Sequence, residues 1–347
     1  MPSVPAPLPD TLPWRVFTRA EALRAGVSAE RLRRSDLTRL RPGLLARRGC
    51  EPTEADIASA ICRNEADAVV MGPSAARMQG IPLPQEESAR TRGHPVHIAI
   101  PGGRRGSDDV VRWRGAVLSD AEVRSTRYSL PRSPDGAAVP LAPVRLTTRA
   151  RTWRDLAASL PQPWLVAVAD HLVRRPRPRL ERGRSTPWCT LEELAQACTG
   201  RHAGTLRRAL AQVRIGADSP QETLLRLTFA RAGLPEPELN VPLIGEDGAP
   251  RHEPDFLWPQ YRVCAEYEGR HHSEAAQIDR DIARARRVSS AGWVEVRLTA
   301  RDARRDGADA VRVVRDALRA RGWTPSSEAD DARSRAHPSR PRAAGCA

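Results

Sequence analysis

The sequence predicts a mixed α/β fold, and three observations support this prediction. Residues 254–268 alternate apolar and polar side chains with period two, which is typical of paired strands. Residues 277–290 and 309–321 carry apolar residues at helical spacing. Strand-like segments at 96–114 are followed by a helix-like segment at 163–173. At 347 residues, the chain is long enough for two or three domains with cores of their own.

Positive charge is concentrated before residue 219. The net charge is +14, and all 56 basic residues are arginine, so a general preference for arginine accounts for part of the total. Residues 219–323 contain 17 arginines and 17 acidic residues, and residues 324–347 contain 4 and 3. Residues 1–218 therefore hold 35 arginines against 22 acidic residues, or +13. A polyanionic partner is expected to bind this part of the chain.

Residues 14–49 are predicted to form a winged helix-turn-helix. Thr18 to Glu21 is a capping box that starts a short helix, because each side chain can bond an amide left free by the first turn. A second helix is expected over residues 28–35, and a hairpin with a Pro-Gly turn over residues 37–48. Two short helices followed by a basic hairpin are typical of this DNA-binding fold.

DNA is the partner that this N-terminal segment predicts. Residues 15–48 contain ten arginines and three acidic residues, which gives +7 in thirty-four residues. Such a concentration favours contacts with backbone phosphates. A solvated arginine face is the alternative. The predicted phosphate-binding residues are Arg31, Arg33, Arg34, Arg39, Arg41, Arg47 and Arg48.

Residues 50–218 are predicted to be a mixed α/β connector, with an Arg/Pro linker at 174–187 and a helix that begins at the capping pattern Thr190-Leu191-Glu192-Glu193. Three segments within the connector carry a family resemblance: Gly72-Pro73-Ser74-Ala75-Ala76, Val96-His97-Ile98-Ala99-Ile100 and the segment from Thr147 to Leu156. At these residues the chain resembles actinobacterial proteins that carry an AbiEi-like antitoxin region. The resemblance spans about residues 14–200 and implies a toxin as a further partner.

Residues 251–272 combine core residues with a row of carboxylates. Two strands, 254–258 and 261–268, are expected to meet at a tight turn at Pro259-Gln260. Alternation predicts a core face and a polar face. The core face would hold Phe256, Trp258, Val263, Ala265 and Tyr267, and the polar face Asp255, Cys264, Glu266 and Glu268. Pairing of Trp258 with Tyr261 would place Asp255 opposite Cys264 and diagonal to Glu266.

Carboxylates at this density repel one another, so they are either solvated at a sheet edge or hold a cation. Mg²⁺, or Mn²⁺ in its place, prefers oxygen ligands and often completes its shell with water and substrate phosphate. A carboxylate face of this kind is typical of metal-dependent hydrolysis of phosphodiesters. The spacing alone leaves both alternatives open.

The order of these residues resembles the core of the PD-(D/E)xK nucleases, in the branch similar to very-short-patch-repair endonucleases. The matching positions include Pro254-Asp255, Glu266-Tyr267-Glu268, Ser219 to Glu222, His272 and Arg284. The resemblance covers about residues 219–323 and implies a restriction-endonuclease-like sheet flanked by helices. It implies that Asp255 and Glu266 bind metal and that Glu268 is a ligand or general base. His272 would orient water or donate a proton, and Arg284 would brace the phosphate.

Two features keep alternatives open. The chain contains no lysine, and Glu268 stands where the family motif ends in lysine, so a cation would have to come from metal, arginine, His271 or His272. Glu222 is a third candidate metal ligand, but Ser219, Pro220 and Glu222 also form a helix-capping pattern. The alternative function is a non-catalytic, antitoxin-like repressor that binds DNA through residues 14–49.

The spacing of the cysteines and the lack of long apolar segments indicate the cellular compartment of the protein. Six scattered cysteines form no CxxC pair, which argues against a zinc site and a disulfide framework. Residues 1–13 are Pro-rich without an apolar signal region, and no run approaches the ~20 apolar residues of a membrane span. A cytoplasmic protein is expected, with disorder at residues 1–13 and 324–347.

Overall fold

The structure is a computed structural model of the chain. It describes residues 5–88, 94–102, 106–134, 136, 138–177, 181, 183–245, 248–268 and 284–325. The fold is mixed α/β, as predicted. The chain divides into two compact units: unit 1 comprises Met1–Val173 and Glu181–Val213, and unit 2 comprises Arg174–Leu180 and Arg214–Ala347.

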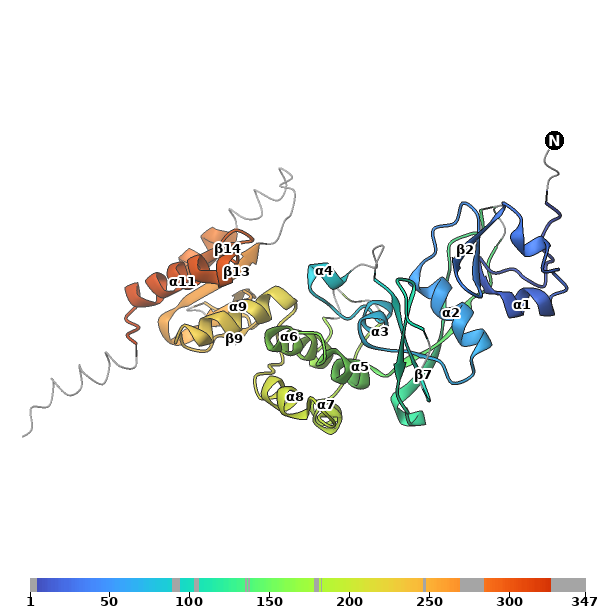
Figure 1. The fold of residues 1–347 in the computed structure, drawn as a ribbon. Helices are drawn as coiled ribbons and strands as arrows, with labels where there is room; N and C mark the ends of the chain where they lie inside the picture. The colour runs from blue at the N-terminus through green and yellow to red at the C-terminus, as the bar shows by residue number, and fades with distance from the viewer. Residues whose placement is uncertain are drawn as a thin grey trace, which may run out of the picture. The chain divides into compact units, whose positions relative to one another are not determined.

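Unit 1 begins with a small antiparallel sheet of order β1-β3-β2 (Figure 1). Its elements are β1 (Val16–Thr18), α1 (Arg19–Arg24), η1 (Arg31–Arg33), β2 (Leu37–Arg41) and β3 (Leu44–Arg47). The capping box at α1 is confirmed, because the Thr18 side chain accepts a hydrogen bond from the Glu21 amide and Glu21 accepts one from the Thr18 amide. The predicted hairpin is β2 with β3.

The predicted second helix over residues 28–35 is wrong. That segment contains only the single 3-10 turn η1, and the chain is extended again at Arg34. Leu32 is the one large apolar side chain of the segment, so no apolar stripe could bury a longer helix. Arg31 instead donates two hydrogen bonds to Asp36, at 2.9 and 2.6 Å, which hold the chain at the start of β2.

The larger sheet of unit 1 has the order β6-β5-β4-β8-β7 and mixes parallel and antiparallel pairs. Its strands are β4 (Val69–Val70), β5 (Val96–Ile100), β6 (Val111–Gly115), β7 (Val123–Tyr128) and β8 (Ala142–Thr147). The neighbouring short elements are α2 (Glu54–Asn64), α3 (Gly72–Met78), α4 (Gln85–Ser88) and η2 (Asp120–Glu122). One core joins α2 and this sheet to Val16, Leu44 and Ala46 of the N-terminal sheet.

Four helices complete unit 1. They are α5 (Arg149–Leu156), α6 (Gln162–Val173), α7 (Leu191–Ala197) and α8 (Ala203–Leu210). Trp153 anchors α5 on α6, because its ring is fully buried and its Nε1 donates to the Leu165 carbonyl at 2.9 Å. The helices predicted over 163–173 and after Thr190 are confirmed.

Unit 2 contains a four-stranded sheet of order β14-β13-β12-β9 and a separate β10-β11 hairpin. Its strands are β9 (Glu238–Leu239), β10 (Leu243–Ile244), β11 (Pro250–His252), β12 (Phe256–Trp258), β13 (Val263–Glu268) and β14 (Val294–Thr299). Its helical elements are α9 (Pro220–Arg231), η3 (Pro259–Tyr261), η4 (Arg305–Gly307) and α11 (Ala308–Ala320), and residues 284–290 are also helical. β13 and β14 are parallel, and the other pairs of this sheet are antiparallel.

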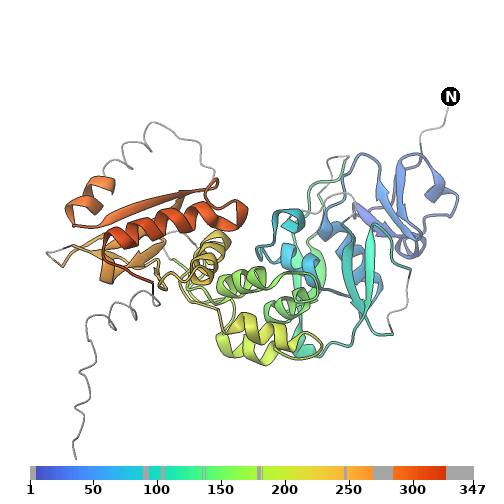
Figure 2. The same ribbon diagram turned by 60° about the vertical axis from the view of Figure 1, so that its left-hand side comes forward.

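Helices cover both faces of this sheet. On one face lie α9 and α11 (Figure 2). Their apolar side chains form one core with Phe256, Trp258 and Val263. On the other face, Val288 and Ala291 pack on Leu257 and Cys264. The predicted core residues of β12 and β13 are therefore confirmed as buried, except Tyr267, which is partly buried. Val294, at the start of the edge strand β14, is 37% exposed.

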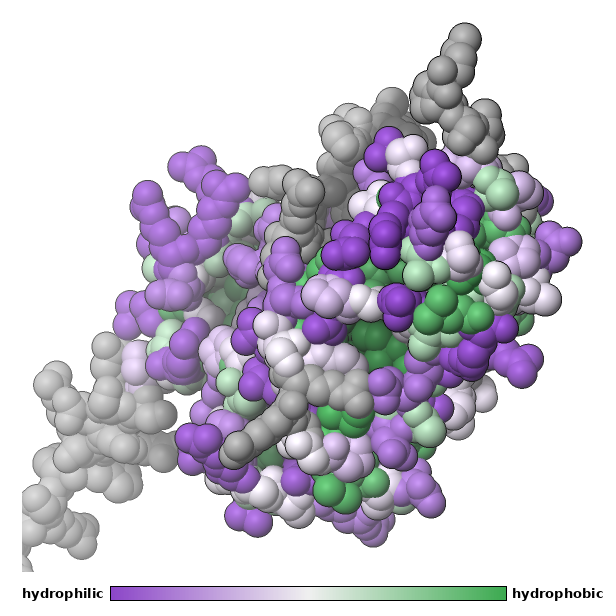
Figure 3. Space-filling model, turned by 45° about the vertical axis from the view of Figure 1, so that its right-hand side comes forward, coloured by the Kyte–Doolittle hydropathy of each residue, from purple (hydrophilic) through white to green (hydrophobic). Residues whose placement is uncertain are grey.

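The surface is mainly polar. Figure 3 shows one face on which hydrophilic residues dominate and hydrophobic residues form smaller patches. Exposed large apolar side chains of the described residues are spread along the chain, from Leu23 to Val294. In the part of the chain that the structure describes, no helix has the length and hydrophobicity needed to cross a membrane.

Candidate functional site

The candidate site lies at the end of β13 in unit 2, and the register of β12 with β13 decides its geometry. Trp258 pairs with Val263, and Phe256 pairs with Ala265. The predicted pairing of Trp258 with Tyr261 is therefore wrong by two residues. The turn is longer than expected because η3 is followed by Arg262 in the left-handed conformation, with φ 50°. The shift keeps each side chain on its predicted face but brings Asp255 level with Glu266 rather than Cys264.

Asp255 is fixed beside β13 by a backbone hydrogen bond. Its Oδ2 accepts from the Tyr267 amide at 2.7 Å. Asp255 lies just before β12, where the regular pairing with β13 has ended, so this amide takes a side-chain acceptor. The bond orients the Asp255 carboxylate along the acidic end of β13.

Glu222 reaches the same region from the first turn of α9. Ser219 caps that helix, since its hydroxyl accepts from the Glu222 amide at 3.2 Å. The Glu222 carboxylate, however, accepts from the Asp218 amide at 2.8 Å and from Asn240 Nδ2 at 2.7 Å. Asn240 also donates its backbone amide to the Asp255 carbonyl at 3.3 Å. Asn240 thereby links the two acidic residues.

The electrostatics of Asp255 reflect this crowding. Burial, followed by the nearby charge of Glu222, raises its pKa from 3.8 to about 7, and Glu266 and Asp218 act in the same direction. The Tyr267 hydrogen bond opposes this change. Burial also raises the pKa of Glu222. Among the described residues, no arginine or histidine forms an ion pair with Asp255 or Glu222.

Glu266 belongs to a second group of ligating side chains. One ligand atom each from His252, Glu266 and Glu295 lie within 4.8 Å of one another. His252 ends β11, and its Nε2 lies in close contact with Glu266 Oε1. Glu295 reaches the group because parallel pairing sets Cys264 beside Glu295 and Glu266 beside Arg297.

Arginines supply positive charge on this face. Arg284 Nη1 lies 2.6 Å from Glu266 Oε2, its Nη2 lies 3.5 Å from Glu268 Oε1, and its Nε lies 3.3 Å from Glu295 Oε1. Arg297 Nη1 lies 3.3 Å from the same oxygen of Glu268. Of the residues predicted for catalysis, Asp255, Glu266 and Glu268 thus adjoin one another on the end of the sheet. His271 and His272 lie outside the described residues.

Among the described residues, one group has ligand atoms close enough together to hold a divalent cation, and it consists of His252, Glu266 and Glu295. Mg²⁺ and Mn²⁺ prefer oxygen ligands, which Glu266 and Glu295 offer. Arg284 already partly neutralises this group through Glu266. Asp255 and Glu222 are further acids of the same region, and the charge of Glu222 acts on Asp255.

Sequence reasoning missed His252, Asn240 and Glu295 as members of the site. His252 precedes the Pro-Asp pair by two residues, and Glu295 begins the pattern of the last strand, but neither position has a local signal. Asn240 carries one such signal. It is followed by Val-Pro in an irregular segment, and its φ of 51° is a conformation that asparagine adopts more readily than most residues.

The seven N-terminal arginines separate into two groups. Arg31, Arg41 and Arg47 are half-buried and bond within unit 1: Arg31 to Asp36, Arg41 to Asp108, and Arg47 to the carbonyls of Leu12 and Trp14. Arg33, Arg34, Arg39 and Arg48 are exposed. Of these four, Arg34 lies 3.5 Å from Glu30 in an ion pair within the segment. Any phosphate contact would depend mainly on the four exposed residues.

Comparison with known protein families gives no match. The chain is similar to two proteins of Mycobacterium tuberculosis, the uncharacterized protein MT2308 of strain CDC 1551 / Oshkosh and the uncharacterized protein Rv2248 of strain ATCC 25618 / H37Rv. Each is 33% identical over 166 residues, which cover 46% of this chain and 61% of the relative. The matched region thus spans less than two thirds of these relatives, and their names assign no activity.

Proposed function

We propose that unit 2 is a metal-dependent nuclease that hydrolyses phosphodiester bonds of DNA. The observation that carries the proposal is the position of Asp255, which the Tyr267 amide holds level with Glu266, a member of the possible ligand group with His252 and Glu295. The raised pKa of Asp255 agrees with this crowding of acids. A bound divalent cation would stabilise a folded protein that concentrates negative charge in this way, because it offsets the repulsion between the carboxylates. The resemblance to the PD-(D/E)xK nucleases supports the same activity.

The side chains have distinct roles in this proposal. Asp255 and Glu266, with Glu222 behind them, would hold Mg²⁺ or Mn²⁺, which supplies charge neutralisation at the scissile phosphate. Glu268 lies at the more open end of β13, with a side chain 40% exposed, and would accept a proton from the attacking water. His272 would orient water or donate a proton at the leaving group.

Arg284 and Arg297 take over the cationic role that the family assigns to lysine. Both guanidinium groups contact Glu268 Oε1, at 3.5 and 3.3 Å, so positive charge lies beside the proposed base. Arginine stays protonated at neutral pH and binds phosphate through a planar fork of donors. These residues would therefore hold the phosphate and would not transfer protons.

The proposed DNA contact of unit 1 would tether the substrate. Arg33, Arg34, Arg39 and Arg48 are exposed around η1 and the β2-β3 hairpin. Contacts of this type bind backbone phosphates without reading sequence. A cytoplasmic location is part of the proposal and rests on the scattered cysteines, of which the five described ones are free thiols.

The nuclease is tested with Asp255→Asn and Glu266→Gln proteins on supercoiled and linear DNA in Mg²⁺ or Mn²⁺. Each substitution is expected to lower the cleavage rate by at least about a hundredfold, because it removes a metal ligand. Asp309→Asn is the matched control, since Asp309 is an exposed carboxylate of α11 in the same unit. Cleavage by both site variants at the wild-type rate would refute the proposal.

The second candidate function is a non-catalytic DNA-binding repressor. It is favoured by Arg284, whose Nη1 pairs with Glu266 Oε2 at 2.6 Å, because this pairing satisfies the Glu266 charge without a metal ion. This function predicts DNA binding without cleavage. Replacing Arg33, Arg34, Arg39 and Arg48 together by glutamine would abolish the binding, and Asp255→Asn would leave it unchanged.

A further inference from the structure

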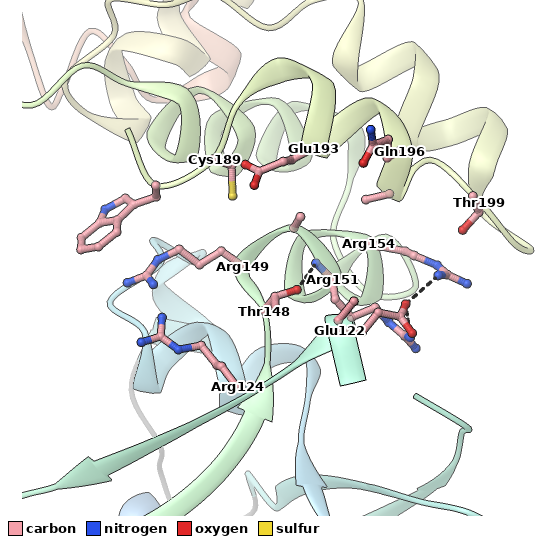
Figure 4. Close-up of a pocket in the computed structure, with 14 residues that line it drawn as sticks. Glu122, Arg124, Thr148, Arg149, Arg151, Arg154, Cys189, Glu193, Gln196 and Thr199 are labelled. Atoms are coloured by element: carbon pink, nitrogen blue, oxygen red, sulfur yellow. Dashed lines mark hydrogen bonds and ion pairs between the residues drawn. The ribbon is translucent and has the colours of Figure 1, made fainter. Parts of the chain in front are cut away.

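Unit 1 contains a basic pocket remote in sequence from the acidic residues of unit 2. It has a volume of about 520 Å³ and lies between the first turn of α5, the start of β7 and α7 (Figure 4). Four arginines line it, Arg124, Arg149, Arg151 and Arg154, together with Glu122 and Glu193. Its size is in the range of pockets that hold small organic ligands.

Two of the four arginines are neutralised within the pocket wall. Arg151 Nη1 lies 2.7 Å and Arg154 Nη1 lies 3.3 Å from Glu122 Oε1. Arg151 also pairs with Asp155 at 2.9 Å. Partial burial tends to raise the pKa of Glu122, but hydrogen bonds from the Ser119 amide and from Arg151, with the Arg151 charge, lower it overall. This side of the pocket is therefore a closed ion-pair network.

The other two arginines lack such partners. In the part of the chain that the structure describes, no carboxylate pairs with Arg124 or Arg149. Figure 4 shows both guanidinium groups on the same side of the pocket, away from Glu122. Glu193 is engaged elsewhere, because its Oε2 accepts from the Thr190 amide at 2.8 Å. Two like charges thus face the same space.

Arg149 is held in place rather than free to swing into solvent. Its guanidinium stacks over the Trp188 ring at 3.7 Å, and its Nη2 donates to the Gln79 carbonyl at 3.3 Å. Its buried Nε has no hydrogen-bond partner among the described residues. Burial and the charge of Arg124 lower its pKa. A fixed cation with an unused donor beside a second cation favours a bound anion.

Cys189 and the start of α5 also belong to this end of the pocket. Burial, followed by the nearby charge of Glu193, raises the pKa of Cys189 to about 12, so its thiol is neutral. Glu193 is the carboxylate of the lining that acts on this end of the pocket. Arg149 opens α5, an eight-residue helix, so the positive end of the helix dipole points at the same region.

We propose that Arg124 and Arg149 of unit 1 form a binding site for a phosphate group. Two guanidinium forks match the oxygens of phosphate, and the Trp188 stack fixes one of them before the ligand arrives. The phosphate has two chemical sources, a free mononucleotide or the end of a nucleic-acid strand. The site does not depend on the nuclease of unit 2.

The test is calorimetric titration of the full-length protein with inorganic phosphate, with AMP and with a 5′-phosphorylated single-stranded oligonucleotide. Arg124→Gln and Arg149→Gln are expected to weaken binding of the preferred probe by about tenfold or more, since each removes a charged donor. Arg127→Gln is the matched control, because Arg127 lies on β7, is exposed, and points to the opposite face from Arg124. Its binding is expected to equal that of the wild type.

The two sources are separated by the probes. If AMP binds more tightly than the oligonucleotide, the ligand of the site is a free nucleotide. If the oligonucleotide binds more tightly, the ligand is the phosphorylated end of a nucleic-acid strand. The Arg124 side chain forms no hydrogen bond or ion pair with another described residue. Arg124→Gln therefore keeps the test valid if Arg149→Gln misfolds. Binding that is equal in the wild type, Arg124→Gln and Arg127→Gln overturns the site, as does a wild type that binds none of the three probes.

Discussion

At the scale of single residues, Asp255 is the most informative group in the molecule. Its carboxylate is fixed by the Tyr267 amide and surrounded by other acids, so its pKa rises to about 7. Folding therefore buries the Asp255 carboxylate beside other acidic residues, and both the burial and these neighbours disfavour its ionised form. Residues in this situation often serve function at the expense of stability.

The first prediction concerns the stability of an Asp255→Asn protein. Because the folded-state pKa lies above the unfolded value of about 3.8, the native state holds a proton that the unfolded state releases between about pH 4 and pH 7. Stability is therefore lost as the pH rises through this range. At pH 8 without metal, the variant should be more stable by on the order of 2–4 kcal/mol. Near pH 4 the two proteins should unfold at similar urea concentrations, and equal stability at pH 8 would contradict the assignment.

The second prediction concerns metal affinity at the same carboxylate. Mn²⁺ must displace the Asp255 proton below pH 7, so the affinity should rise by up to about tenfold per pH unit from pH 5.5 to 7 and then level off. Calorimetric titration of Mn²⁺ at several pH values measures this dependence. The Asp255→Asn protein supplies the control, and its weaker binding should be less sensitive to pH. An affinity independent of pH in the wild type would argue against Asp255 as a ligand.

At the scale of elements, short helices depend on their caps. Four of the caps in the described residues are full capping boxes, at Thr18, Thr53, Ser119 and Thr190. The sequence signature of Thr18 and Thr190 was sufficient to predict both helices, because the bonds form within one turn. The segment 28–35 also had a capping serine, and Ser28 does accept from the Arg31 amide at 3.1 Å. Without an apolar stripe to bury, this cap supports only a single 3-10 turn.

The third prediction tests a cap directly. Thr190→Ala should destabilise unit 1 by about 1 kcal/mol, because the Glu193 amide loses its acceptor at 3.1 Å. The expected decrease in the melting temperature is a few degrees. Thr190→Ser is the matched control, since it keeps the hydroxyl and should melt near the wild type. A Thr190→Ala protein that melts with the wild type would show that α7 is held by packing alone.

At the scale of the whole molecule, the chain forms two compact units with separate cores. The core of unit 1 joins the N-terminal sheet to the α/β region through Val16, Leu44 and Ala46. The core of unit 2 is centred on Phe229, Phe256 and Trp258, whose rings lie 5.4 to 6.3 Å apart. Separate cores allow each unit to unfold on its own.

The fourth prediction follows from these separate cores. Phe229→Ala should destabilise unit 2 by about 3–5 kcal/mol, because it leaves a cavity between two aromatic rings. Differential scanning calorimetry should then show one transition shifted downward and one unchanged. Leu146→Ala, at a fully buried position of unit 1, should shift the other transition. A single transition that moves as a whole in both variants would show that the two units unfold cooperatively.

The sequence by itself determined the α/β class, most helix starts, and which side chains of β12 and β13 share a face. These features depend on hydrogen bonds and on the periodicity of side chains within one helix or strand, so they can be predicted from residues that are close in sequence. It also identified Asp255, Glu266 and Glu268 as members of one acidic face.

The tertiary structure decided how that face is completed. The left-handed Arg262 lengthens the turn and brings Asp255 level with Glu266, and the parallel pairing of β13 with β14 delivers Glu295. His252 and Asn240 come from separate segments between α9 and β12. In unit 1, the fold likewise brings Arg124 of β7 and Arg149 at the start of α5 to one pocket. Among the described residues, neither arginine has a carboxylate as an ion-pair partner. Contacts of this kind depend on strand register and on packing between distant segments. The free energy that selects them is summed over the whole fold, so a local stretch of sequence carries no pattern from which they could be predicted.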